Sequence, residues 1–353
     1  MRAAETMTSL QRTLTTLGHA EPDRVPLFLL NNLHGSKELG LTPKEYFANP
    51  EYVTEGQLRL RRKYGDDCLY SFFYAAVEVE AWGGEVIYID EGPPNAGQPI
   101  VGHFDDIFDL HVPVIGEIPA LNRVLRATEL MKAEIGDEAP IIGVVMSPFS
   151  LPVMQMGFED YLLLLFEHPE AFRRLMEVNV EFCIRWANAQ LAAGATAICY
   201  FDPVSSPTII PREMYGDTGY RIARETLPRI EGPTATHLAS GRVLPIAGQL
   251  TETGTAALGV GESEDLCDLK ATFSGKLSLL GNLNGIEMVG WNERGAHAAV
   301  ADAIARAGAG GGFILSDNHG EIPFQVSSDT MMAIADAVRE YGRYPLDGDV
   351  RDA

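Results

Sequence analysis

The sequence predicts a single (β/α)8 TIM barrel over residues 1–353, with an N-terminal helical extension and a β-hairpin insertion after the second strand. Two observations carry this prediction. Short apolar runs recur eight times along the chain, with helix-like stretches between them, and polar residues follow nearly every run. Regular alternation of buried strands and helices is typical of a parallel barrel. No short-period repeat or low-complexity tract favours another architecture.

Each element follows from its local pattern. The predicted strands are 25–30, 68–73, 140–146, 196–201, 234–236, 256–261, 277–280 and 313–315. The predicted helices are 4–18, 42–47, 50–64, 121–135, 158–166, 169–193, 211–227, 293–307 and 329–341, and a further helix is expected to begin near Cys267. Residues 78–101 alternate in polarity and are interrupted by Gly83-Gly84 and Gly92-Pro93-Pro94, a pattern that indicates the inserted hairpin.

Composition excludes several classes of protein. A formal net charge of -22 argues against nucleic acid and anionic membrane surfaces as partners. The four cysteines share no CxxC spacing, which suggests a reducing compartment. The N-terminus lacks the apolar core of a signal peptide, and no apolar run is long enough to cross a membrane. We therefore expect a cytoplasmic protein; the sequence does not indicate its oligomeric state.

A barrel would collect the residues that follow its strands on one rim, where such proteins bind their substrates. The candidates for substrate contact are Asn31, Asn32, His34, Tyr74, Ser147, Phe149 and Asn282. Asp202 follows the fourth strand and is a candidate catalytic residue, as a base or as a group that orients the substrate. The alternatives are loop capping for the polar residues, ordinary packing for the aromatic ones, and backbone hydrogen bonding for Asp202.

Three metal-capable side chains follow the fifth, sixth and eighth strands: His237, Glu262 and His319. Two imidazoles and a carboxylate leave one coordination position open, which is the usual composition of a catalytic zinc site. We also expect Glu262 to take part in catalysis. Each histidine taken alone fits a hydrogen-bonding role equally well, and Cys267 is an alternative third ligand if its thiol is not simply packed in the core.

Several motifs, loose one by one but ordered along nearly the whole chain, resemble the uroporphyrinogen decarboxylase superfamily. They are Arg24-Val25-Pro26, Lys63-Tyr64-Gly65-Asp66-Asp67, Glu80-Ala81-Trp82-Gly83-Gly84, Ser147-Pro148-Phe149, Ala192-Ala193-Gly194-Ala195-Thr196 with Asp202-Pro203, Leu280-Gly281-Asn282-Leu283 and Ile314-Leu315-Ser316. The resemblance implies a barrel of this kind. It also implies either a decarboxylase or a zinc-dependent methyltransferase that works with a corrinoid.

The segment after the first strand favours the methyltransferase branch. The decarboxylases have an arginine-rich segment there for the carboxylates of their substrate, whereas this chain has Asn31-Asn32-Leu33-His34. The methyltransferases that methylate coenzyme M carry His-x-Cys after strand five and Cys after strand eight. This chain matches that pattern at His237, but it has Ala239 and His319 where the two cysteines would stand.

Imidazole and carboxylate ligands would leave zinc a stronger Lewis acid than thiolates do, which suits activation of an ether oxygen. The resulting hypothesis is a cobalamin-dependent O-demethylase that moves a methyl group from a small methoxylated, aromatic substrate to cobalt(I) of a partner corrinoid protein. Alternatives are methyl transfer from a methylated corrinoid to a thiol, a tetrapyrrole decarboxylase, and a non-catalytic corrinoid-binding protein. The sequence leaves open the methyl donor and the direction of transfer.

Overall fold

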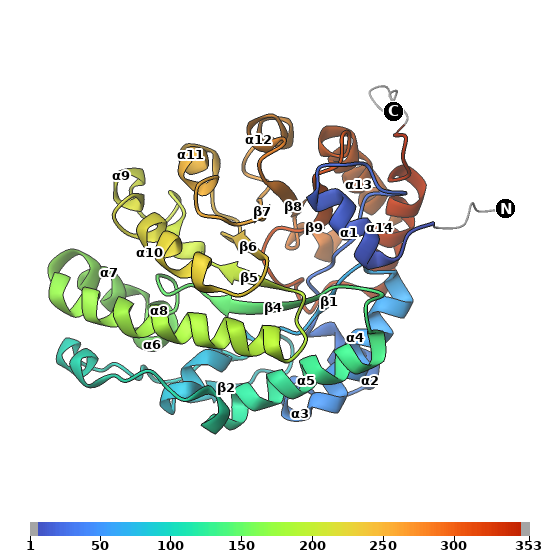
Figure 1. Cartoon of the computed structure of the whole chain (residues 1–353). Coiled ribbons are helices and arrows are strands. Elements are labelled where there is room, and N and C mark those ends of the chain that lie inside the picture. The colour runs from blue at the N-terminus through green and yellow to red at the C-terminus, as the bar shows by residue number, and fades with distance from the viewer. Residues whose placement is uncertain (1–5, 347–353) are drawn as a thin grey trace.

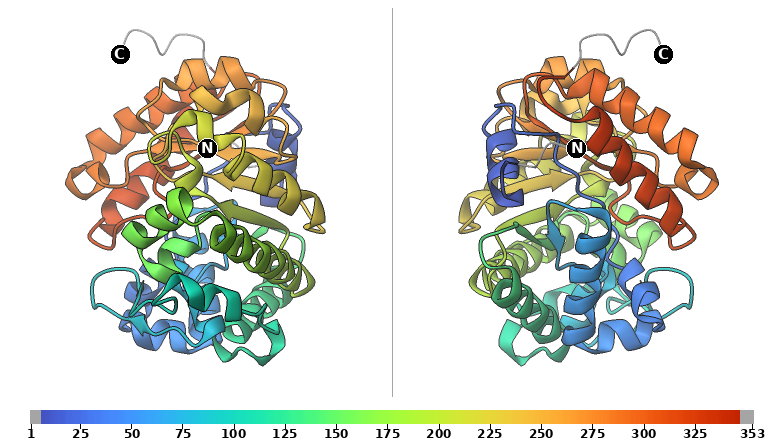
Figure 2. Two further views of the ribbon diagram at one scale, coloured as in Figure 1. Left: turned by 90° about the vertical axis from the view of Figure 1, so that its left-hand side faces the viewer. Right: turned by 90° about the vertical axis from the view of Figure 1, so that its right-hand side faces the viewer.

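Seven parallel strands form one curled sheet at the centre of the molecule (Figure 1). The computed structural model describes residues 6–346. Along the sheet the strands are β1 (Leu69–Tyr70), β4 (Ile141–Met146), β5 (Ala197–Phe201), β6 (Thr234–His237), β7 (Ala257–Gly259), β8 (Ser278–Leu283) and β9 (Phe313–Asp317). Neighbours in the sheet follow one another in the chain, with helices in between, so the fold is a TIM-barrel-like α/β fold. Helices surround the strands (Figure 2).

The predicted first strand, 25–30, is the one that does not form as a regular strand. It makes a single parallel bridge, Leu27 to Leu315 of β9, and the Leu27 carbonyl accepts the Asp67 N–H at 2.7 Å just before β1. The segment therefore lies between the two edges of the sheet. The ladder is incomplete because Pro26 has no N–H and because the Leu27 N–H donates to the Asp67 carboxylate at 2.9 Å rather than to a strand.

The helices lie close to their predicted positions. They are α1 (Ser9–Leu17), α3 (Pro43–Ala48), α4 (Pro50–Tyr64), α5 (Pro119–Ile135), α7 (Phe158–Glu167), α8 (Pro169–Ala192), α9 (Arg212–Tyr215), α10 (Gly219–Thr226), α12 (Leu266–Phe273), α13 (Glu293–Ala307) and α14 (Ser328–Tyr341). Residues 4 and 5 of the predicted leading helix lie outside the described residues. The predicted helix 211–227 is divided into α9 and α10, and three short helices were not predicted: α2 (His34–Leu39), α6 (Pro152–Met156) and α11 (Ala247–Leu250).

The inserted hairpin is shorter than predicted. Only β2 (Val86–Ile87) and β3 (Asn95–Ala96) pair, in antiparallel fashion, while the segment Ala75–Trp82 is a 3-10 helix. The prediction of alternating strand structure from residue 78 is therefore wrong at its start. Alternate residues of this segment are not divided between core and solvent, because Ala76, Val77, Glu78 and Val79 are all buried.

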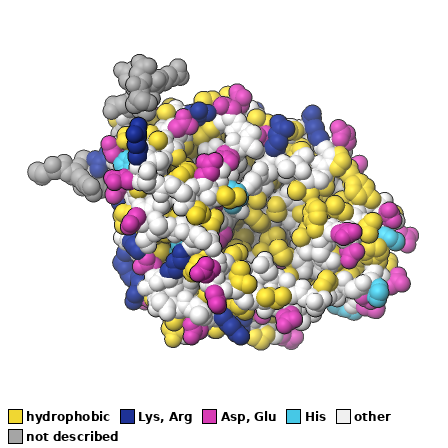
Figure 3. Space-filling view, turned by 180° about the vertical axis from the view of Figure 1, so that it is seen from behind, with side chains coloured by type: hydrophobic (Ala, Val, Ile, Leu, Met, Phe, Trp, Pro, Cys, Tyr) yellow, Lys and Arg dark blue, Asp and Glu magenta, His cyan; other side chains and the backbone are white. Residues whose placement is uncertain are grey.

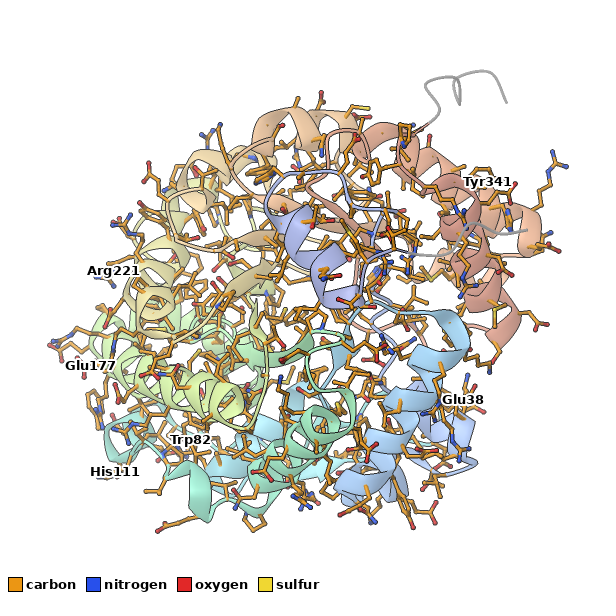
Figure 4. All side chains as sticks on the ribbon, turned by 45° about the vertical axis from the view of Figure 1, so that its right-hand side comes forward. Glu38, Trp82, His111, Glu177, Arg221 and Tyr341 are labelled. Atoms are coloured by element: carbon orange, nitrogen blue, oxygen red, sulfur yellow. The ribbon has the colours of Figure 1, made fainter. Side chains whose placement is uncertain are left out.

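One end of the sheet is covered by α1, which lies in front of the strands in Figure 1. Thr13 and Leu17 of α1 line a small apolar cavity of about 70 Å³ inside the curled sheet. Outer helices present charged residues to solvent, as Glu177 of α8 and Arg221 of α10 show in Figure 4. Within residues 6–346, no helix has the length and apolarity needed to cross a bilayer.

Candidate functional site

The face opposite to that of Figure 1 is hollowed near its middle, and hydrophobic side chains line the hollow (Figure 3). The carboxyl ends of the strands contribute to a cavity of about 150 Å³, to which His319 and Glu321 from the loop after β9 also belong. Six of its lining residues are aromatic: Phe47, Tyr70, Phe72, Phe73, Tyr74 and Phe201. A cavity at this end of parallel strands is the expected position of a binding site.

His237 is the last residue of β6, and its side chain is almost fully buried, with 1% exposure. Its Nδ1 accepts the N–H of Ala239 at 3.0 Å, whereas its Nε2 is buried without a hydrogen-bond partner. The ring packs on Phe201, with centroids 5.5 Å apart. Burial, assisted by the nearby His319, lowers the pKa of His237 to about 4, so this imidazole is neutral at pH 7.

His319 is partly buried in the loop after β9, and its Nδ1 is buried without a partner. The loop after β8 lies over this nitrogen, since a Cβ added to Gly285 would stand 3.4 Å from it. Burial lowers the pKa of His319, while the nearby carboxylate of Glu262 opposes that shift. His319 is thus close enough to both His237 and Glu262 to interact with each of them electrostatically.

Glu262 is exposed, and its carboxylate accepts a hydrogen bond from the Asn284 amide. It also lines a second, polar groove of about 440 Å³, together with Asn282 and with residues of α12 and α13. Glu262 therefore faces a different space from the aromatic cavity. Cys267 is exposed in the first turn of α12, where its N–H donates to Asp265.

The predicted zinc ligands meet one requirement of a metal site and do not meet another in this structure. The buried nitrogens of His237 and His319 without partners suit a site that gains its partner on ligand binding. However, within residues 6–346 no three His, Cys, Asp or Glu side chains are already grouped so that they could hold a metal ion. Zinc binding would require Glu262 to leave Asn284. It would also require the proton of neutral His237 to move off Nε2, where the Ala239 hydrogen bond places it.

Asp202 is buried between the ends of β4 and β5. Its carboxylate accepts hydrogen bonds from the hydroxyls of Ser147 and Ser150, and its backbone N–H donates to the His237 carbonyl at 2.8 Å. Burial raises the pKa of Asp202, although these hydroxyls partly offset the effect. Neither Asp202 nor Ser147 lines the aromatic cavity. Their contacts fit a role in joining the ends of the strands.

Four predicted substrate contacts also lie outside the cavity. The Asn32 side chain accepts hydrogen bonds from Tyr46 and Gln57, and the Asn31 amide donates to Asp66. His34 lies within hydrogen-bonding distance of the Pro323 carbonyl, at 3.1 Å, and Phe149 packs fully buried against Tyr161 and Phe172. These four side chains are engaged with the scaffold and do not line this cavity, so their contact with a substrate stays a prediction.

Of the predicted substrate contacts, Tyr74 does line the cavity. Its ring forms part of the wall, and its hydroxyl points to Glu80, at 2.8 Å, and Tyr88 of the hairpin segment. The residues that sequence reasoning missed are mainly Phe72, Phe73, Phe201 and Glu321. Their positions just past β1, at the end of β5 and two residues past His319 were the available signal.

Comparison with known proteins defines the class to which this fold and rim belong. The uroporphyrinogen decarboxylase (URO-D) family matches residues 8–341, so the chain belongs to that family. Among curated relatives, it is 28% identical to uroporphyrinogen decarboxylase of Xylella fastidiosa (94% of this chain and 98% of the relative). It is 25% identical to that of Bordetella petrii (84% of each).

Solved structures support the same fold. A methyltransferase from Methanosarcina mazei superposes with a TM-score of 0.83 at 21% identity, over 95% of this chain and 99% of that one. A B12-independent methionine synthase from Shewanella sp. superposes with a TM-score of 0.54 at 11% identity, over 84% and 89%. At these identities the superpositions establish the fold and leave the reaction to be argued from the site.

Proposed function

We propose that the chain is a zinc-dependent methyltransferase that moves a methyl group from a small methoxylated aromatic compound to cobalt(I) of a separate corrinoid protein. The observation that carries the proposal is an aromatic-lined cavity that includes His319 and borders, through Phe201, on His237. A ligand in this cavity would meet His319 directly, whereas His237 lines the neighbouring apolar cavity of about 70 Å³ and adjoins the aromatic one through the Phe201 ring. The methyltransferase from Methanosarcina mazei, with its similar fold, supports the choice of reaction.

The two histidines, with Glu262 as third ligand, would hold the zinc. When bound, zinc supplies Lewis acidity at the ether oxygen of the substrate. The bond between the methyl carbon and oxygen would break with its electron pair staying on oxygen, which would take up a proton from solvent as the product leaves. The corrinoid protein, as methyl acceptor, would provide from its cobalt(I) the electron pair for the new bond to the methyl carbon. The cavity walls orient the ring and keep water from the oxygen.

A second candidate, decarboxylation of a tetrapyrrole, is favoured by the names of the curated relatives. Such a substrate carries many carboxylates, which need cationic partners. The cavity offers none, because its described lining residues include neither lysine nor arginine. A ring system of four pyrroles also requires far more room than about 150 Å³.

The test is a methyl-transfer assay with zinc-loaded protein, a cobalt(I) corrinoid protein and a panel of methoxylated aromatics, followed by the absorbance change of the corrinoid and by product analysis. We expect demethylation that stops when zinc is removed and resumes when it is restored. Full activity of zinc-free protein would contradict the role of zinc. Release of CO2 from a tetrapyrrole, without demethylation, would favour the decarboxylase.

A further inference from the structure

The charge and size of the aromatic cavity restrict its ligand more closely than the reaction type does. Its volume is about 150 Å³. An engineered apolar cavity of about this volume in another protein binds one benzene molecule. The space therefore suits one six-membered ring with a short substituent, and it does not suit fused rings.

The walls suit a flat, apolar ring. Tyr70 and Phe72 lie with their centroids 5.5 Å apart and Phe47 and Phe73 with theirs 5.4 Å apart, and the rings of each pair are tilted, by 40° and 34°. A bound aryl ring can extend this arrangement with offset or edge-to-face contacts. Aliphatic residues, such as Leu33 and Val144, complete the wall.

In the metal-free protein, the side chains that line the cavity supply no lysine or arginine charge to an anion. All its lining residues fall within the described range, and none is lysine or arginine. Glu321 lines it, with its carboxyl accepting the Leu33 N–H at 2.8 Å. If ionised, this carboxyl repels a substrate carboxylate; if neutral, it offers one O–H donor but no positive charge. Neither state supplies the cation that a desolvated carboxylate needs.

Two cationic side chains, Lys37 and Arg123, contact other groups of the protein. Lys37 lies over the Phe324 ring, 4.0 Å from its centroid, and donates to the Phe324 carbonyl. Arg123 lies 3.7 Å from Glu80, on the hydroxyl side of Tyr74. Neither lines the cavity.

From this lining we infer that the substrate is an uncharged, single-ring aryl methyl ether, and that ring compounds carrying a carboxylate are rejected. The inference rests on the proposed function and names its substrate class. Reaction chemistry points the same way, because an aryl oxide is the anion of a phenol with a pKa near 10, as in tyrosine, and so leaves readily. A quaternary ammonium compound is the competing ligand, since aromatic faces attract cations. Such an ion would, however, lose its hydration against a wall that is partly aliphatic.

The test is calorimetric titration of the full chain, free of metal and corrinoid, with a matched pair of ligands. We expect 3-methoxybenzamide and 2-methoxyphenol to bind, and 3-methoxybenzoate, which has nearly the shape of the amide, to bind at least tenfold more weakly at pH 7.5. Equal or tighter binding of the benzoate would overturn the inference. Tightest binding of tetramethylammonium would overturn it in favour of a cation site.

Two lysine variants test whether the cavity wall sets the preference for uncharged ligands. Asn95 of β3 is exposed and lines the cavity, whereas Gln98 is exposed in the same hairpin segment but does not line it. Asn95→Lys should raise the ratio of benzoate affinity to benzamide affinity about tenfold, and Gln98→Lys should leave that ratio unchanged. If both variants strengthen benzoate binding equally, general charge rather than the cavity sets the preference, and the inference fails.

These experiments can contradict the inferred substrate class and the proposed reaction independently of each other. If the neutral aryl ethers bind as expected but no methyl reaches a corrinoid, the substrate class stands and the proposed demethylase does not. If a non-aromatic ether is demethylated while no aryl ether binds, the reaction stands and the inferred substrate class is wrong.

Discussion

Gly259 of β7 lies directly against the imidazole of His237 in the neighbouring strand. The two residues are register partners, and a Cβ built on Gly259 would stand 2.3 Å from the His237 Cδ2 atom. Carbon atoms that are not bonded to each other do not approach so closely, so any side chain at position 259 must displace the ring. The orientation of His237 thus depends on a glycine one strand away.

Gly259→Ala is therefore expected to lower the free energy of unfolding by roughly 1–3 kcal/mol, the usual cost of overpacking a core. It should also lower the affinity for zinc, because the imidazole moves. Chemical denaturation and metal titration measure the two effects. Gly248→Ala is the matched control, since its added Cβ would meet no atom within 4 Å. Equal stability and zinc affinity in Gly259→Ala and the unmodified protein would show that the ring has room to move.

Asp67 stabilises the segment that closes the sheet. Its buried carboxylate pairs with Arg12 at 2.6 Å and Arg24 at 2.7 Å, and it accepts the Leu27 N–H. Asp67→Ala should reduce the free energy of unfolding by roughly 3–5 kcal/mol, because it removes the anion shared by two buried guanidinium groups.

Glu55→Ala provides the control for Asp67. It breaks an ion pair with Arg59 in which both side chains are more than 40% exposed, and such pairs contribute about 0–1 kcal/mol. Urea denaturation of both variants compares the loss of the buried ion pairs of Asp67 with the loss of the exposed pair of Glu55. A loss of less than about 1 kcal/mol in Asp67→Ala would mean that segment 25–30 is held in another way.

His34 should make stability depend on pH. Burial, followed by the charge of Lys37, lowers its pKa to about 4 from the ordinary value of 6.5. Between these values the unfolded chain binds the proton and the folded chain does not. The contribution of His34 is therefore fully present above pH 6.5 and is lost as the pH falls toward 4.

His34→Gln should remove that part of the acid sensitivity, which we expect to be roughly 2–3 kcal/mol between pH 7 and pH 4. Denaturation curves of the variant and the unmodified protein at several pH values measure it. Because His34 lies outside the aromatic cavity, the variant should bind 2-methoxyphenol normally at pH 7.5. Loss of that binding would support His34 as a substrate contact instead.

The sequence predicted most of the fold because buried strands and amphipathic helices leave strong local patterns. All seven strands of the sheet fall within three residues of their predicted limits, although β1 is shortened to Leu69–Tyr70. The segment 25–30 has the same apolar pattern as the others. What stops it from forming a regular strand is long-range: the carboxylate of Asp67, some forty residues later, takes the N–H of Leu27.

The site was predicted less completely, for a different reason. Position after a strand identified residues near the rim, but it could not say which way a side chain points. Asn32 and Phe149 turn into the scaffold, whereas Phe201 at the end of β5 turns toward the cavity. The direction in which a side chain points depends on packing between distant elements, as in the contact of His237 with Gly259. A single sequence does not reveal such packing.

The most direct test of the central claim is elemental analysis of the purified protein beside its His237→Ala, His319→Ala and Asp202→Asn variants. We expect about one zinc per chain in the unmodified protein and in Asp202→Asn, whose carboxylate is already bonded to serine hydroxyls. Both histidine variants should lose most of it. Full zinc content in both histidine variants, or no zinc in the unmodified protein after loading, would contradict the account and reduce the two imidazoles to parts of the scaffold.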